Sequence, residues 1–503
     1  MHRHVLAKVF LLSLIVLMAV PAAAQDIDAI KSKVTSFTLD NGLQFIVYEN
    51  HDAPVFTYFS QVKVGAVNEV PGITGLAHMF EHMAFKGTPD IGTSDYKKEM
   101  KLIAKVDETY DAWAAARIAG ASEGELETLW EKVAEAQEAA GEPIVTNEFG
   151  SIVEKNGGTG LNAYTTPDIT GYFYSMPSNK LELWAYLESE RFERPVMREF
   201  YKERDVVMEE RRMRTESSPI GRLIEEFLAA SYLGHPYGQP TVGHMSDLQS
   251  FTRQDAVDFY EKYYPPSNIV VCLAGDVDPD EVKKLAEKYF GDWKTAPVPE
   301  PVRTVEPEQR GERRVTMEDP GQPFYLVAYH KPNSTHPDSP VFDVITELVA
   351  NGRSSRLHGR LVKEEKKAIQ VGAITGIPGE IYPGLLISYA VPSKGVSALE
   401  CEAAVLEEFE RLKTEMVGEA ELEGVKTRMK TNWVRGIRSN QGMAGTLLQG
   451  ALIHGDWEAA LNYGVEIDAV SAADIQRIAN EYFNTNNRTV GLIVTEEGAD
   501  DAS

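Results

Sequence analysis

Cysteine is nearly absent from this sequence: among 503 residues only Cys272 and Cys401 occur, and they lie in different halves of the chain. Small domains that depend on disulfides carry several cysteines, so a disulfide framework does not hold this fold. We expect both thiols to behave as small buried hydrophobic side chains.

Basic residues are also in the minority. The chain has 50 Lys and Arg against 76 Asp and Glu, a formal net charge of -26, and no part of it forms a long basic stripe. A nucleic-acid phosphate backbone would be repelled, so nucleic acid is excluded as a partner. Acidity of this size favours solubility instead.

Long hydrophobic runs are missing after the N-terminus. Residues 1–24 are typical of a signal peptide, with basic residues at positions 3 and 8, an apolar run over 9–20 and Ala22 to Ala24 before Gln25. The apolar run is too short for a bilayer, which takes about 20 residues, although a retained membrane anchor is the alternative. We expect an exported mature protein, periplasmic or extracellular, with no membrane span.

The middle of the chain predicts a division into two domains. A stretch rich in proline and charge, about residues 296–310, lacks apolar periodicity and is expected to be a linker. It separates an N-terminal domain, 25–295, from a C-terminal domain, 311–503. Within the first, residues about 96–145 are rich in Ala, Glu, Lys and Leu, which predicts an inserted helical hairpin with a solvated charged face.

The two halves share a pattern. Thr252 and Asp255 form a capping-box signal before a helical segment and an apolar β-type run, and Ser471 and Asp474 do the same in the second half, at a constant offset along the chain. Two copies with identical internal spacing predict a duplicated α+β unit rather than a repeat solenoid.

The segment Gly75-Leu-Ala-His78-Met-Phe-Glu81-His82 carries the clearest chemical signal. Apolar residues recur at spacings of four and three over 73–85, which predicts a helix with both histidines on one face. Two imidazoles can then bind one zinc ion, with a coordination position left for water. Glu81 can reach that water and act as its base. Chance produces such motifs too, so the hypothesis requires a third ligand.

We expect that ligand to be a carboxylate on another helix, predicted over 196–215. Glu203 and Glu210 lie seven residues apart, which is two turns, and therefore share a face. Alone, such a pair among arginines is typical of a salt-bridged surface. Beside H-x-x-E-H it favours metal binding, with the neighbouring Glu209 as an alternative ligand.

Together these segments resemble the pitrilysin/insulinase family of zinc metallopeptidases, which includes the mitochondrial processing peptidases. The resemblance covers essentially the whole mature chain. Besides the duplicated halves and the two glutamates after H-x-x-E-H, it rests on Asn162-Ala-Tyr-Thr-Thr166, His235-Pro-Tyr-Gly-Gln-Pro240 with Gly243, and Gly352-Arg-Ser-Ser-Arg-Leu357.

The resemblance implies one Zn²⁺ per chain, bound by His78, His82 and Glu210. It implies that Glu81 is the catalytic base and that Glu203 orients a ligand histidine. The 25–295 domain is then the catalytic zinc domain and 311–503 the non-zinc domain. The implied fold is α+β, with two similar halves, each a mixed β-sheet covered by helices, enclosing a chamber.

The resemblance also implies a substrate-binding edge strand that pairs with an extended peptide. A plain edge strand is the alternative. The strand residues are Asn162, Ala163, Tyr164 and Thr165.

Two departures from the family pattern stand out. Glu210 follows His82 at a longer interval than the family implies, and the 96–145 insertion absorbs the surplus. In the second half, Val362 and Ile369 stand where active members carry an Arg and a Tyr. This implies a related partner subunit that supplies the missing pair in a heterodimer, although a homodimer or a self-sufficient monomer is also possible.

We therefore predict a zinc-dependent endopeptidase that hydrolyses peptides or small unfolded proteins, with a metal-bound water activated by Glu81. One alternative is a catalytically silent binding or assembly subunit of a peptidase-like complex, against which the intact set of ligands argues. A metal carrier or sensor is a further alternative, which predicts bound zinc without hydrolysis.

Overall fold

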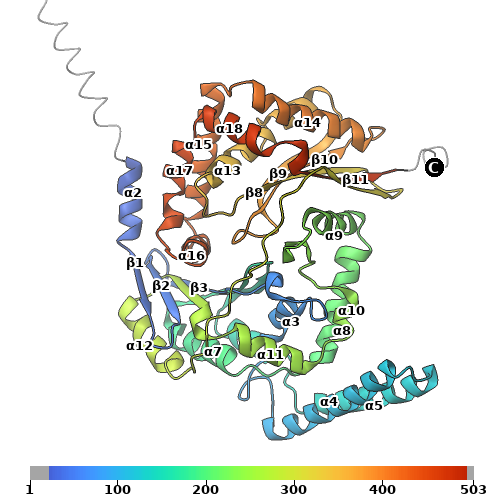
Figure 1. Ribbon diagram of the computed structural model, residues 1–503. Helices are drawn as coiled ribbons and strands as arrows, with labels where there is room; N and C mark the ends of the chain where they lie inside the picture. The colour runs from blue at the N-terminus through green and yellow to red at the C-terminus, as the bar shows by residue number, and fades with distance from the viewer. Residues whose placement is uncertain (1–21, 496–503) are drawn as a thin grey trace, which may run out of the picture.

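The computed structural model describes residues 22–495, which form two mixed β-sheets with helices packed on their faces (Figure 1). Most of the expected signal peptide, residues 1–21, lies outside the described residues. None of the helices in the described part of the chain is long and apolar enough to cross a bilayer.

The first sheet has six strands in the order β1-β2-β6-β3-β5-β4. Only β2 and β6 run parallel; every other pair is antiparallel. The strands are β1 (Val34–Thr38), β2 (Gln44–Glu49), β3 (Val55–Val62), β4 (Thr159–Thr165), β5 (Thr170–Pro177) and β6 (Ile269–Gly275). The β1–β2 hairpin turns at Gly42, whose φ of 93° favours the glycine found there.

The second sheet repeats this arrangement with one strand fewer, in the order β7-β11-β8-β10-β9. Its only parallel pair, β7 and β11, corresponds to β2 and β6, but it lies at the edge because the described residues of the second sheet include no counterpart of β1. The strands are β7 (Arg313–Glu318), β8 (Phe324–Lys331), β9 (Ala368–Ile377), β10 (Gly384–Pro392) and β11 (Arg488–Val494).

The expected duplication is confirmed at the level of single elements. Helices α11 (Arg253–Tyr263) and α18 (Ala472–Tyr482) each begin with a complete capping box and lead into β6 and β11. The two strands are offset along the chain by the same interval as the two helices. The fold is therefore two similar α+β halves, as the sequence predicts.

The remaining α-helices lie between these strands, except α2, which precedes β1. In the first half they are α2 (Ala22–Lys31), α3 (Leu76–Met83), α4 (Tyr96–Ile118), α5 (Glu123–Gly141), α6 (Glu148–Lys155), α7 (Leu181–Glu193), α8 (Phe200–Arg211), α9 (Pro219–Ser231), α10 (Met245–Leu248) and α12 (Pro279–Phe290). In the second half they are α13 (Ser339–Val349), α14 (Ala398–Thr414), α15 (Glu419–Gly436), α16 (Asn440–Gln449) and α17 (Tyr463–Ala469).

Each half packs one of its helices against the sheet of the other half. Helix α9 of the first half packs on β7 and β11 of the second sheet, where Phe227 is fully buried beside Leu326 and Ile493. Helix α16 of the second half packs on β3 and β6 of the first sheet, where Leu447 is buried beside Cys272. Each sheet thus has its own helices on one face and a helix of the other half on the other face (Figure 1).

Helices α4 and α5 pack against each other as a long hairpin that extends from the first half (Figure 1). At its base, Thr93 and Ile144 form an isolated antiparallel bridge. The chain leaving the hairpin therefore returns to the body of the first half at Ile144. Cys272 and Cys401 are both buried and unpaired, as expected from their scarcity.

Candidate metal centre

The helix that carries the H-x-x-E-H motif begins later than the predicted residue 73, because Gly75 caps it in a left-handed conformation with φ of 96°. A Cβ at this position would lie 2.7 Å from the Val242 carbonyl oxygen, so only glycine fits. The buried carboxyl of Glu69 accepts hydrogen bonds from the Gly75 and Ala77 N–H groups, at 2.7 and 2.6 Å. Burial raises the pKa of Glu69 to about 8. These contacts fix the first turn of α3.

The helical spacing places the two histidines on one face of α3, with a distance of 4.9 Å between their ring centroids. The opposite face, which includes Phe80 and Met83, is buried in the core of the first half. Burial lowers the pKa of His78 to about 3, so its imidazole is neutral, as a metal ligand must be.

Helix α8 packs against α3 and supplies the two glutamates. It begins at Phe200 rather than at the predicted Val196, because Glu199 has a φ of 53° and interrupts the helical backbone. Beyond α8, residues Arg212–Glu216 continue as a π-helical turn. The part that faces α3 is helical throughout, so Glu203 and Glu210 share a face as the seven-residue spacing predicts.

Glu210 meets both histidines. Its two carboxylate oxygens lie 3.5 Å from His78 Nε2 and 3.5 Å from His82 Nε2. These distances exceed a good hydrogen bond. They match the separation of about 3.3–3.4 Å between ligand atoms around a tetrahedral zinc with bonds of about 2.0–2.1 Å. Among the described residues, these three side chains are the group close enough to share one ion. The donor set and its geometry therefore fit zinc.

The rival ligand Glu209 points away from this group. Its side chain is 59% exposed and pairs with Arg212 at 2.9 Å, one turn further along the helix. The structure thus brings Glu210 and not Glu209 to the histidines. Arg214 also contacts the Glu210 carboxylate, with 2.5 Å between Nη1 and Oε1.

Glu203 holds the second histidine. Its Oε1 lies 3.1 Å from His82 Nδ1, and its Oε2 lies 2.5 Å from Lys86 Nζ. Burial raises the pKa of the Glu203 carboxyl, but the hydrogen bonds from His82 and Lys86 outweigh it and bring the pKa to about 2. An ionised Glu203 accepts the Nδ1–H of His82, which leaves Nε2 free to bind a metal.

Glu81 lies outside the three-ligand group. Its Oε2 accepts a hydrogen bond from Thr165 Oγ1 at 2.6 Å. Burial raises the pKa of Glu81 above the usual range of a glutamate. A carboxylate of raised pKa is suited to accept a proton near neutral pH.

The strand β4 forms the edge of the first sheet and lies beside His78, His82 and Glu210. With the histidines and glutamates it lines a cavity of about 750 Å³. The four residues expected to bind substrate all line this cavity: Asn162, Ala163, Tyr164 and Thr165. The segment after the helical hairpin, residues 144–147, lines the same cavity and was not expected from the sequence, because the whole hairpin separates it from the motif.

In the second half, the two residues expected in place of an Arg and a Tyr are both apolar. Val362 is partly buried against the second core, and Ile369 on β9 is 62% exposed. Helix α13, which follows β8 as α3 follows β3, contains no histidine. The second half therefore repeats the fold of the first half without the histidines that α3 carries.

Comparison with known proteins gives the class. A family model described as "Insulinase (Peptidase family M16)" matches residues 45–109, and one described as "Peptidase M16 inactive domain" matches residues 250–429. The zinc protease PqqE of Helicobacter pylori is 30% identical over 488 residues, which cover 95% of this chain and 96% of that protein. The probable mitochondrial-processing peptidase subunit beta of Arabidopsis thaliana is 23% identical, over 93% of this chain and 79% of that protein.

Comparison with solved structures gives the same class of protein. The crystal structure of a protease from Helicobacter pylori superposes with a TM-score of 0.77 and 28% identity, over 92% of this chain and 99% of that chain. These are metallopeptidase-like proteins of two similar α+β halves. The chain belongs to the insulinase family, peptidase family M16, as the resemblance of its motifs implies.

The position of Glu210 makes a prediction about metal binding. We expect Glu210→Gln to lose stoichiometric zinc, because it leaves two imidazoles with a neutral amide as the third donor. Glu209→Gln changes the adjacent residue in the same way and should keep the zinc of the parent. Zinc content of the purified proteins, measured by plasma mass spectrometry after dialysis, checks both. Equal zinc in both variants would contradict the assignment.

Proposed function

We propose that this chain is a zinc-dependent endopeptidase that hydrolyses peptides or small unfolded proteins. The observation that carries the proposal is the convergence of His78, His82 and Glu210 at ligand spacing, with Glu81 beside them. His78, His82 and Glu210 would hold the ion. When bound, zinc lowers the pKa of a coordinated water toward 7 and polarises the scissile carbonyl.

The residues around the three proposed ligands have separate roles in the proposed reaction. Glu203 keeps the imidazole of His82 oriented by accepting its Nδ1–H, and Lys86 keeps Glu203 ionised. Glu81 accepts the proton of the attacking water and passes it to the leaving amine. Thr165 donates to Glu81 and so ties the position of the base to the end of β4.

The edge strand provides a physical basis for the choice of substrate. β4 pairs with β5 on one side, and no strand of the described residues pairs with it on the other. An extended peptide can add to this edge through its backbone, whereas a folded protein cannot supply such a segment. Substrates are therefore unfolded or short, and recognition at β4 depends little on side chains.

We further propose that the protein is exported and acts with a second subunit. Its first 24 residues have the pattern of a signal peptide. Val362 and Ile369 leave the second half without the expected Arg and Tyr, which a related chain in a heterodimer, or a second copy in a homodimer, would supply. Relatives include a protein named as a subunit of a processing peptidase.

The alternative is a catalytically silent subunit, which the description "inactive domain" favours. That match covers residues 250–429, however, and contains none of the proposed ligands. The two functions differ in one observable. A silent subunit cleaves no peptide alone or with a related partner, whereas the proposed enzyme cleaves in at least one of these states.

Glu81→Gln tests the proposed base. We expect it to keep its zinc and lose about 10²–10⁴-fold in kcat/KM, because the amide cannot accept the proton. Cleavage of a fluorogenic peptide, together with zinc content, measures both. The matched control is Glu209→Gln, which should cleave like the parent. Parental activity in Glu81→Gln would contradict the mechanism.

Thr165→Val tests how the base is tuned. The hydrogen bond from Thr165 lowers the pKa of Glu81, against the larger effect of burial, which raises it. Removing the hydroxyl should raise this pKa further, so more of Glu81 is protonated at low pH. We expect the acidic limb of the pH profile of kcat/KM to move to higher pH, with less change on the alkaline side. An unchanged limb would show that Glu81 does not set it.

A further inference from the structure

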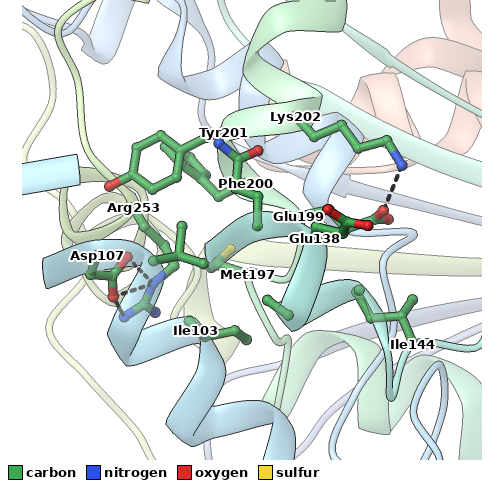
Figure 2. Close-up of a pocket in the computed structure, with 14 residues that line it drawn as sticks. Ile103, Asp107, Glu138, Ile144, Met197, Glu199, Phe200, Tyr201, Lys202 and Arg253 are labelled. Atoms are coloured by element: carbon green, nitrogen blue, oxygen red, sulfur yellow. Dashed lines mark hydrogen bonds and ion pairs between the residues drawn. The ribbon is translucent and has the colours of Figure 1, made fainter. Parts of the chain in front are cut away.

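A second cavity lies between the helical hairpin and the first turn of α8 (Figure 2). Its volume is about 280 Å³. It lies outside the group of proposed ligands. The apolar side chains that line it come from α4, α5, the 141–144 connection and the start of α8: Ile103, Val106, Ala140, Ile144, Met197 and Phe200.

Four of the five charged residues that line this cavity form two ion pairs, and the fifth, Glu138, is exposed to solvent. Arg253 contacts Asp107 at 2.6 Å, and Lys202 contacts Glu199 at 2.8 Å, on opposite sides of the cavity in Figure 2. Because four of these charges already have partners, Glu138 is solvated and the wall between them is mainly apolar, the cavity favours an uncharged occupant. An apolar cavity of about 150 Å³ is enough to hold a benzene ring, so this one has room for a large apolar side chain.

This cavity adjoins the cavity at His78, His82 and Glu210. Ile144 and Glu199 line both. From Tyr201, which lines the second cavity, to Glu210 is nine residues of helix, or about 13 Å at a rise of 1.5 Å per residue. An extended peptide covers this distance with about four residues. Four residues of an extended peptide are therefore long enough to bring one side chain from the group of proposed ligands to the second cavity.

The wall of the second cavity is also linked to the metal site. Lys86 contacts Glu199 at 3.3 Å and Glu203 at 2.5 Å, and Glu203 in turn contacts His82. Glu199 is one of three residues other than glycine with positive φ in the described part of the chain, an unfavourable conformation for glutamate. Its ion pairs with Lys86 and Lys202 hold it there.

We propose that this cavity is a substrate subsite, which takes one large apolar side chain, aromatic or branched aliphatic, about four residues from the scissile bond. The inference rests on the proposed endopeptidase function and adds a sequence preference to it. The helical hairpin is then part of the substrate-binding surface, because two of its helices and the connection after it form most of the wall.

The test uses a set of peptides that differ only in the position of one Phe in an otherwise Ala- and Ser-rich sequence. The full-length protein, with its partner if one is required, should show at least a tenfold higher kcat/KM for Phe at one position about four residues from the cleaved bond. Gly141→Phe adds a large side chain at the wall of the cavity and is expected to fill it: Gly141 lines the cavity, and a Cβ there meets no atom within 4 Å. This variant should lose the preference and keep the cleavage rate of the all-Ala peptide.

Gly124→Phe is the matched control. Gly124 is on the same helix, its Cβ also meets no atom within 4 Å, and it does not line the cavity. The control should keep the preference. A wild-type protein with equal rates for all positions would overturn the proposal, as would a preference that persists in both Gly141→Phe and a second filling variant, Ala140→Leu.

The experiments distinguish a wrong endopeptidase function from a wrong subsite. If no form of the protein cleaves any peptide, the endopeptidase function is wrong, and binding then decides the subsite. Fluorescein-labelled Phe and Ala peptides are titrated into the Glu81→Gln protein and followed by anisotropy. At least tenfold tighter binding of the Phe peptide, lost in the Glu81→Gln, Gly141→Phe double variant, supports the subsite. Equal binding of the two peptides overturns it.

Discussion

The packing of helix α8 against helix α3 is the contact on which the proposed chemistry depends. It places the Glu203 carboxylate 3.1 Å from His82 Nδ1 and, two turns later, the Glu210 carboxylate 3.5 Å from both Nε2 atoms. One helix thus orients a histidine and completes the ligand set. Several charges are buried here, which is costly unless they are paired. Lys86 and Arg214 supply cations to the two carboxylates.

The rest of the first half holds these two helices at a fixed distance and leaves one side open. Glu69 and Gly75 fix the start of α3, and the core of the first half buries its apolar face. The sheet edge at β4 then lies beside the motif, and Thr165 joins the two through Glu81. Helices α9 and α16 bind each half to the back of the other sheet, so the second half contributes structure even though it lacks the ligands.

Much of this could be predicted from sequence, because the signals are local or periodic. The spacing in H-x-x-E-H and the seven residues between Glu203 and Glu210 state which side chains share a helical face. The constant offset between the two capping boxes predicted the duplication, and the strands repeat it. The choice of Glu210 over Glu209 rested on spacing and a family resemblance, and the structure places Glu210 rather than Glu209 beside the histidines.

Other features had no signal in the sequence. The packing of α9 and α16 depends on which sheet an amphipathic helix covers, and the hydrophobic pattern of α9 or α16 is the same for either sheet. The cavity beside the hairpin depends on side chains from residues 103 to 253, whose meeting is a property of the tertiary fold. Helices α3 and α8 begin later in the structure than predicted, because Gly75 and Glu199, which precede them, adopt a positive φ.

The proposed chemistry requires that two imidazoles and one carboxylate share a single ion. X-ray absorption at the zinc edge of the purified protein tests it most directly. We expect a shell of nitrogen and oxygen donors at about 2.0–2.1 Å, with the multiple-scattering pattern of two imidazoles and no sulfur. A shell with a thiolate, or one with fewer than two imidazoles, would contradict it.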